Sequence, residues 1–146
     1  MLLAAGIMSH FVGDLGQPLH AAEDYDGYAK GQGGIHKYFE TEVVEELPLG
    51  LSREVFEKAI KDQPFAAMMT RVTGEKTKFS RDHAAMAIAM CVDGFNNVAT
   101  LLELDRKHSL IKESTQEPLK LPAKRKPSKE VLEAYRPLVI ERMALA

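Results

Sequence analysis

The sequence predicts a single all-α domain, a bundle of five or six helices that covers residues 1–146. Apolar residues recur every three or four positions in several segments, which is the spacing of one helix face. Runs that alternate with period two, as strands do, are few. A length of 146 residues fits one domain, and a hydrophobic share of 45% is ordinary for a globular protein.

The first half of the chain contains two expected helices joined by a loop. The first helix covers about residues 2–15, and Gly16 and Pro18 disrupt it. Its apolar face consists of Leu3, Ile7, Phe11 and Leu15. Residues 21–34 are rich in glycine and aspartate and indicate a loop. A second helix begins near Ile35 and ends at Leu47, just before Pro48.

The second half adds three or four helices. One starts after Ser52, a favourable N-cap, and Pro64 either kinks it or starts a separate helix that reaches about Val72. Ser80 can cap a long helix to about Lys107, which we expect to be central and largely buried. Its predicted core side consists of Ile88, Val92, Phe95, Val98 and Leu102. Residues 112–127 indicate irregular structure, and Ser128 can cap a last helix, broken or kinked near Pro137.

Composition excludes several functional classes. The formal net charge of −2 gives no bulk attraction to nucleic acid or to an anionic membrane. The single cysteine, Cys91, excludes an internal disulfide. The longest apolar run, Ala84 to Val92, is too short to span a bilayer, so we expect no transmembrane segment. No basic stretch precedes the apolar residues Met1 to Met8, so we expect no secretory signal in this chain.

Histidines and acidic residues are concentrated between Ser9 and Thr41. His10 and Asp14 are four residues apart on one expected helix, and His36 and Glu40 are four apart on the next. Side chains at this spacing share a helix face, with β-carbons about 6 Å apart, so that an imidazole and a carboxylate can bind one metal ion. His20 follows the break in the first helix and can turn toward the same place.

These residues predict a zinc site. His20, His36 and Glu40 would supply three ligands and leave the fourth position to water, as in catalytic rather than structural zinc sites. His10 and Asp14 would form part of a second site, so we expect one to two zinc ions (Zn²⁺). Asp24 and Asp26 are interpreted as turn residues that bond to the local backbone.

The segment HFVGDLGQPLH, residues 10–20, resembles the signature of the zinc-dependent phospholipase C and single-strand-specific nuclease superfamily. In that family a His-x-x-x-Asp pair precedes Gln-Pro-Leu-His, and a second His-x-x-x-acid pair follows after a loop. By this resemblance His10 and Asp14 match the first pair, with Asp14 as a bridging, catalytic carboxylate. His20 matches the final histidine of the run, and His36 and Glu40 match the closing pair.

The resemblance implies an all-helical metalloenzyme with three zinc ions that hydrolyses phosphate esters. The substrate would be single-stranded nucleic acid or a phospholipid headgroup, and the protein would be secreted or periplasmic. The family places further ligands upstream of the first pair, where this sequence offers no counterpart, and Gly16 replaces a histidine that many of its nucleases carry. We therefore also consider an N-terminally truncated or shortened member.

Two hypotheses remain open. In the first, the chain is a zinc-dependent phosphodiesterase in which metal-activated water attacks phosphorus. In the second, it is a non-catalytic helical binding or assembly domain with a residual or structural zinc site. The sequence leaves the oligomeric state open.

Overall fold

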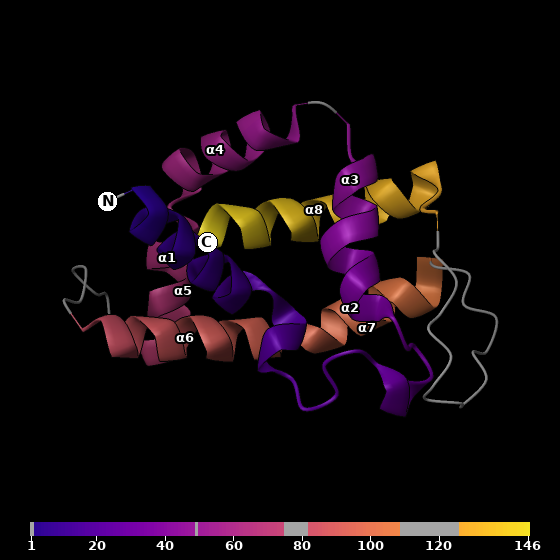
Figure 1. Ribbon diagram of the computed structural model, residues 1–146, viewed down its shortest axis with the longest axis horizontal. Helices are drawn as coiled ribbons and strands as arrows, with labels where there is room; N and C mark the ends of the chain where they lie inside the picture. The colour runs from indigo at the N-terminus through magenta and orange to yellow at the C-terminus, as the bar shows by residue number, and fades with distance from the viewer. Residues whose placement is uncertain (1, 49, 75–81, 109–125) are drawn as a thin grey trace.

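The computed structural model describes residues 2–48, 50–74, 82–108 and 126–146, and within these ranges it consists of helices and turns without any strand (Figure 1). The predicted all-α class is confirmed. Helices of ten residues or more in this part of the chain are α1 (Leu2–Gly16), α4 (Leu51–Asp62), α5 (Pro64–Thr73), α6 (His83–Asn96), α7 (Val98–His108) and α8 (Lys129–Leu145).

Shorter helical elements connect α1 to α4. After α1 come two 3-10 turns, η1 (Pro18–Ala21) and η2 (Tyr28–Lys30). Then α2 (Ile35–Lys37), the π-helical turn η3 (Tyr38–Val43) and α3 (Val44–Glu46) follow one another without a gap. The helix predicted from Ile35 to Leu47 is therefore confirmed, but its middle turn is wider than an α-helical turn.

Helix α8 lies at the centre, and α4 and α7 pack against it from opposite sides (Figure 1). Tyr135 of α8 is fully buried and meets the ring of Tyr38 edge-on, with ring centroids 6.1 Å apart. The main core comprises Leu19, Ile35, Tyr38, Phe39, Val43, Leu47, Leu101, Val131, Tyr135, Leu138 and Val139. A smaller core of Met68, Met69, Ala89, Met90 and Leu145 joins α5, α6 and the end of α8. The main core holds η1 and the 35–46 helix in place.

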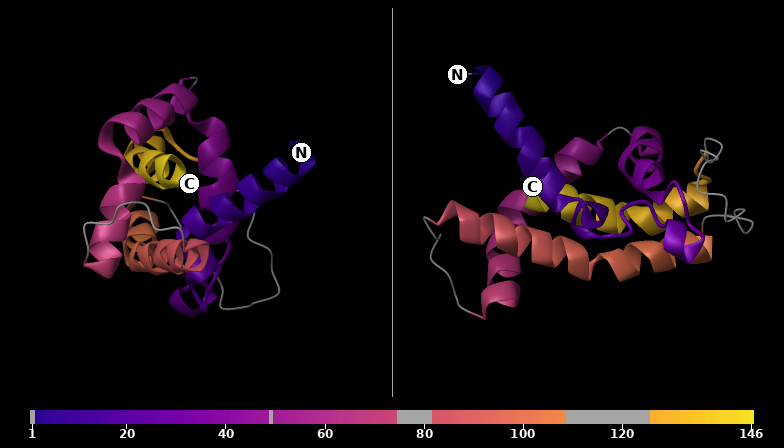
Figure 2. Two further views of the ribbon diagram at one scale, coloured as in Figure 1. Left: turned by 90° about the vertical axis from the view of Figure 1, so that its left-hand side faces the viewer. Right: turned by 60° about the horizontal axis from the view of Figure 1, so that its bottom comes forward.

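The predicted apolar faces of two helices are largely exposed. Helix α1 projects from the body and packs only near its C-terminal end (Figure 2), so Leu3 is 79% exposed and Phe11 is 60% exposed. Ile7 is also exposed, and so are Ile88, Val92 and Phe95 of α6. The expectation that Ile88, Val92 and Phe95 face the core, and that the long helix is largely buried, is wrong. Periodicity identifies an apolar face but not the element that covers it.

Several helices begin or end at residues other than the predicted ones. Helix α4 begins after Gly50 rather than Ser52, and Pro64 opens the separate helix α5. Asp82 caps α6 through the Ala85 N–H, and the predicted cap Ser80 lies outside the described residues. The long helix divides at Asn97 into α6 and α7.

Ser128 caps α8 as predicted, and α8 continues through Pro137 without a break. The predicted irregular stretch 112–127 lies outside the described residues, except for its last two positions. The combined segment His83–His108 is long and apolar enough to cross a membrane, with a mean hydropathy of 1.4. One such helix is weak evidence, because core helices of soluble proteins meet the same criterion.

Candidate metal centre

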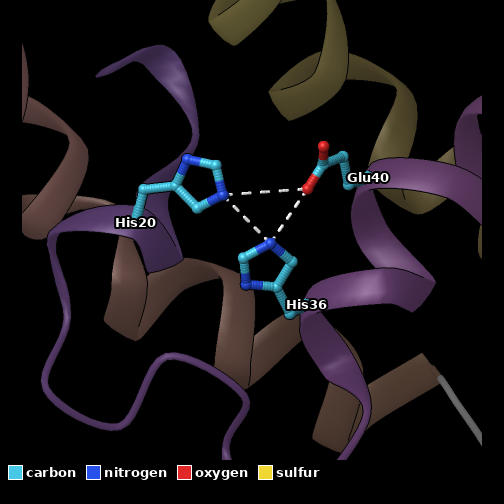
Figure 3. A group of neighbouring side chains, drawn as sticks. All are labelled: His20, His36 and Glu40. Atoms are coloured by element: carbon cyan, nitrogen blue, oxygen red, sulfur yellow. Dashed lines mark hydrogen bonds and ion pairs between the residues drawn. The ribbon is translucent and has the colours of Figure 1, made fainter. Parts of the chain in front are cut away.

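Three of the predicted ligands meet at one point between η1 and the 35–46 helix (Figure 3). The His20 and His36 Nε2 atoms are 3.0 Å apart, and the His36 Nε2 lies 2.9 Å from Glu40 Oε2. The His20 Nε2 lies 3.9 Å from the same Glu40 oxygen. The structure therefore brings together His20, His36 and Glu40 from two elements, although they are up to 20 positions apart in the sequence.

The spacing of these three atoms fits a zinc ion. A tetrahedral zinc ion with bonds of about 2.0 Å holds its ligand atoms about 3.3 Å apart. The three distances here, 2.9, 3.0 and 3.9 Å, lie on either side of that value. The set of two imidazoles and one carboxylate is also a known catalytic zinc set.

The contacts of the two imidazole rings suit a cation between them. The His20 Nδ1 lies 3.1 Å from the Asp14 carbonyl oxygen, and the His36 Nδ1 lies 3.1 Å from the Tyr25 carbonyl oxygen. Because a carbonyl only accepts, each Nδ1 is the donor of its bond, which leaves each Nε2 as the atom that would bind a metal ion. The two Nε2 atoms and a carboxylate oxygen then face one another, and only a shared proton or a metal ion makes that arrangement favourable. A histidine that donates its second N–H to a carbonyl is the usual form of a zinc ligand.

The glycine-rich loop positions one of these rings. Asp24 accepts the Ala29 N–H at 3.0 Å, and Asp26 accepts the His36 N–H at 3.2 Å, in agreement with the interpretation of both as turn residues. Gly27 has φ +77°, and a β-carbon there would lie 2.8 Å from Ile35 Cγ2. Only glycine fits this position, so the loop can close tightly and present the Tyr25 carbonyl to His36.

The predicted second pair lies beside the three ligands but does not join them. His10 Nε2 is 3.5 Å from Asp14 Oδ2, and the His10 side chain is 74% exposed. Asp14 Oδ1 lies 3.7 Å from His20 Nδ1, which is already bonded to a carbonyl. His20, His36 and Glu40 are close enough to share one ion. Among the described residues, no other group of three or more His, Cys, Asp or Glu side chains meets this criterion. His10 and Asp14 provide at most two ligands of a second site.

A cavity of about 340 Å³ opens beside the three ligands, between α1, the 35–46 helix and α8. His10, Asp14 and Glu40 line it, together with Gln17 and Arg142. The sequence analysis did not identify Arg142, because nothing in the local pattern of the last helix distinguishes it from a surface arginine. Its role depends on contacts with residues 49 and 126 positions away.

Buried charges support the wall of this cavity. Arg142 Nη1 donates to Asp93 Oδ2 at 2.5 Å, and Arg71 Nη2 donates to Asp93 Oδ1 at 2.9 Å. Burial alone would raise the pKa of the Asp93 carboxyl, but the hydrogen bonds from Arg142 and Arg71 outweigh it and hold this pKa below its usual value. Asp93 is therefore ionised at neutral pH and links α5, α6 and α8.

Comparison of this chain with protein-family models, curated proteins and solved structures finds no match. The resemblance to the phospholipase C and nuclease superfamily stays a prediction carried by residues 9–40. The geometry of His20, His36 and Glu40 is an observation independent of that resemblance.

Zinc is expected to stabilise the folded protein. At free zinc about 100 times its dissociation constant, mass action adds about 2.7 kcal/mol, which corresponds to a rise in melting temperature of about 5–10 °C. Thermal unfolding with zinc, with a chelator and with an equal concentration of magnesium measures this. An identical melting temperature under all three conditions would contradict a zinc site.

Proposed function

We propose that this chain is a zinc-dependent hydrolase of phosphate esters, related to the zinc-dependent phospholipases C and single-strand-specific nucleases. The observation that carries the proposal is the convergence of three ligand atoms, His20 Nε2, His36 Nε2 and Glu40 Oε2, within 2.9–3.9 Å of one another. Three of the five motif residues of the resemblance, His20, His36 and Glu40, are the ones that converge.

The openness of the site supports catalysis rather than a structural role. Structural zinc sites fill four positions with protein ligands, whereas catalytic sites keep one for water or substrate. Here three ligands meet, and their side chains remain 30% (His20), 21% (His36) and 47% (Glu40) exposed. The cavity that Glu40 lines gives a substrate room on the Glu40 side of this point.

A zinc ion at this point would supply an acidified water and a positive charge to polarise a phosphoryl oxygen. The chain itself orients the two imidazole rings and the attacking water. The carbonyls of Asp14 and Tyr25 hold the two rings with their Nε2 atoms facing inward. The Asp14 carboxylate is 33% exposed and lines the cavity, where it can accept a hydrogen bond from the attacking water.

The expected substrate is a phosphodiester, either in single-stranded nucleic acid or in a phospholipid headgroup. The reaction breaks one P–O ester bond, water adds to phosphorus, and the leaving oxygen takes a proton. Both substrate classes present the same phosphoryl group to the site, so a small diester can test the chemistry that they share.

The purified chain is expected to hydrolyse bis(p-nitrophenyl) phosphate with zinc, to lose this activity after chelation and to regain it when zinc is restored. Release of p-nitrophenolate, followed by its absorbance, measures the rate. Equal hydrolysis by metal-free protein would refute the proposal. Tight zinc binding with higher thermal stability but no turnover would instead support the alternative of a non-catalytic domain with a structural zinc site.

A further inference from the structure

The cavity beside the three ligands has two buried hydrogen-bond donors in its wall. Among the described residues, neither Gln17 Nε2 nor Arg142 Nη2 has a hydrogen-bond partner. The Gln17 side chain is 8% exposed and that of Arg142 is 4% exposed, and both residues line the cavity. Buried polar atoms in folded proteins nearly always have a partner, so each such exception needs an explanation.

The hydrogen bond of the Gln17 side-chain oxygen fixes the orientation of its amide. Gln17 precedes η1 and caps it, because its Oε1 accepts the backbone N–H of Leu19. An N–H can only bond to the oxygen of the amide, so the amide nitrogen is necessarily the end left without a partner. A flipped amide would lose the cap and bring two donors together.

The Arg142 guanidinium is held on two of its three nitrogens. Its Nε donates to the Gly16 carbonyl at 2.8 Å, and its Nη1 donates to Asp93. A β-carbon on Gly16 would lie 3.2 Å from Ala146 Cβ, so glycine allows α1 to approach α8 this closely. The bond ties the guanidinium to Gly16, the residue before Gln17 in the chain, and both side chains line the same cavity.

The charge of the arginine cluster behind Gln17 favours an anion, whereas the Asp14 and Glu40 carboxylates that line the same cavity favour the metal ion. Two guanidinium groups, those of Arg71 and Arg142, share the single Asp93 carboxylate. One positive charge is therefore left without a paired negative charge in this cluster. A neutral acceptor or water could use the hydrogen bonds, but only an anionic oxygen uses both the hydrogen bonds and the charge.

We infer that Gln17 and Arg142 form an anion-binding subsite that takes a phosphate oxygen of the substrate next to the three metal ligands. The identity of the anion as substrate phosphate rests on the proposed function. A cavity of about 340 Å³ is at the lower end of the range for small-ligand sites, about 300–1,000 Å³, and has room for a phosphate group. The subsite holds the phosphoryl group, and His20, His36 and Glu40 supply the metal chemistry.

The substitution Gln17→Glu tests this inference with little change of shape. One carboxylate oxygen can still accept the Leu19 N–H, while the other replaces the unpartnered donor with a negative charge beside Arg142. The affinity for inorganic phosphate is expected to fall at least about 10-fold, which equals about 1.4 kcal/mol. The melting temperature is expected to stay the same or rise, because the new carboxylate pairs with the guanidinium.

Isothermal titration with inorganic phosphate at constant ionic strength measures the affinity, both with zinc and after chelation. Gln63→Glu is the matched control, since it makes the same charge change at an exposed position and should bind phosphate like the wild type. Gln17→Met, which has neither donor nor charge, should also lose phosphate affinity and covers the case in which Gln17→Glu does not fold.

Unchanged phosphate affinity in both Gln17 variants would overturn the inference, even if zinc-dependent hydrolysis is found. Loss of phosphate affinity in a protein that shows no zinc-dependent turnover would support the subsite and reject the proposed function. The two proposals can therefore fail separately.

Discussion

Replacing His36 with alanine is expected to lower the affinity for zinc at least about 100-fold and to abolish zinc-dependent hydrolysis. The His36 Nε2 lies 3.0 Å from His20 Nε2 and 2.9 Å from Glu40 Oε2, so it completes the set of three ligands. Without it, two ligand atoms remain, 3.9 Å apart. Loss of an outer partner of a metal ligand costs about 10–100-fold in affinity, and loss of the ligand itself should cost more.

Competition with a chromophoric chelator gives the zinc affinity, and p-nitrophenolate release gives the rate. His83→Ala is the control, because His83 is exposed at the start of α6 and lines a different cavity, which lacks the three ligands. That variant should keep wild-type zinc affinity. Wild-type zinc affinity in the His36→Ala protein would show that the ion binds elsewhere.

Replacing Asp93 with alanine is expected to lower the free energy of unfolding at pH 7 by about 3–5 kcal/mol. Asp93 is 4% exposed and accepts hydrogen bonds from both Arg142 and Arg71. Its removal leaves the Arg142 guanidinium buried without a counter-charge, which costs more than most single substitutions. Urea denaturation followed by circular dichroism measures the change.

The matched control is Asp62→Ala. Asp62 forms an exposed pair with Lys58 at 3.0 Å, and such surface pairs contribute at most about 1 kcal/mol. An Asp93→Ala protein within about 1 kcal/mol of the wild type would mean that the guanidinium finds another partner or reaches water.

The pH dependence of stability has a definite sign at Asp93. Its pKa in the folded protein lies below the value for an unfolded chain, so the folded state favours the ionised form. This contribution is fully present above about pH 4, the unfolded pKa of an aspartate, and is lost as the pH falls through the lower, folded pKa. The wild-type protein should therefore lose stability below about pH 4 more steeply than the Asp93→Ala protein.

Local patterns predicted the helices and the convergence of His20, His36 and Glu40 well. His36 and Glu40 are close because residues four apart share a helix face, and His20 is close because the helix ends at Gly16 and the chain turns. These relations involve few residues and follow from short-range geometry. The helix beginning at Ile35 was found for the same reason.

Long-range packing explains what the sequence did not reveal. Leu3, Phe11 and Ile88 occupy apolar helix faces, yet no described element covers them. The pairing of Asp93 with Arg142 joins α6 to α8 across 49 positions, so no local pattern indicates it. The π-helical turn is also invisible to a search for helical periodicity, since one extra residue in a turn changes the spacing only slightly.

That turn, η3, has a consequence for how the chain tolerates insertions and deletions. A π-helical turn accommodates one residue more than an α-helical turn, so it shifts the angular phase of every side chain that follows it. Glu40 points toward His20 and His36, and Val43, at the end of the same turn, is buried in the core. Deleting one residue here would regularise the helix but rotate one of these faces away from its target. The extra residue thus lets one helix direct Glu40 toward the two histidines and Val43 toward the core.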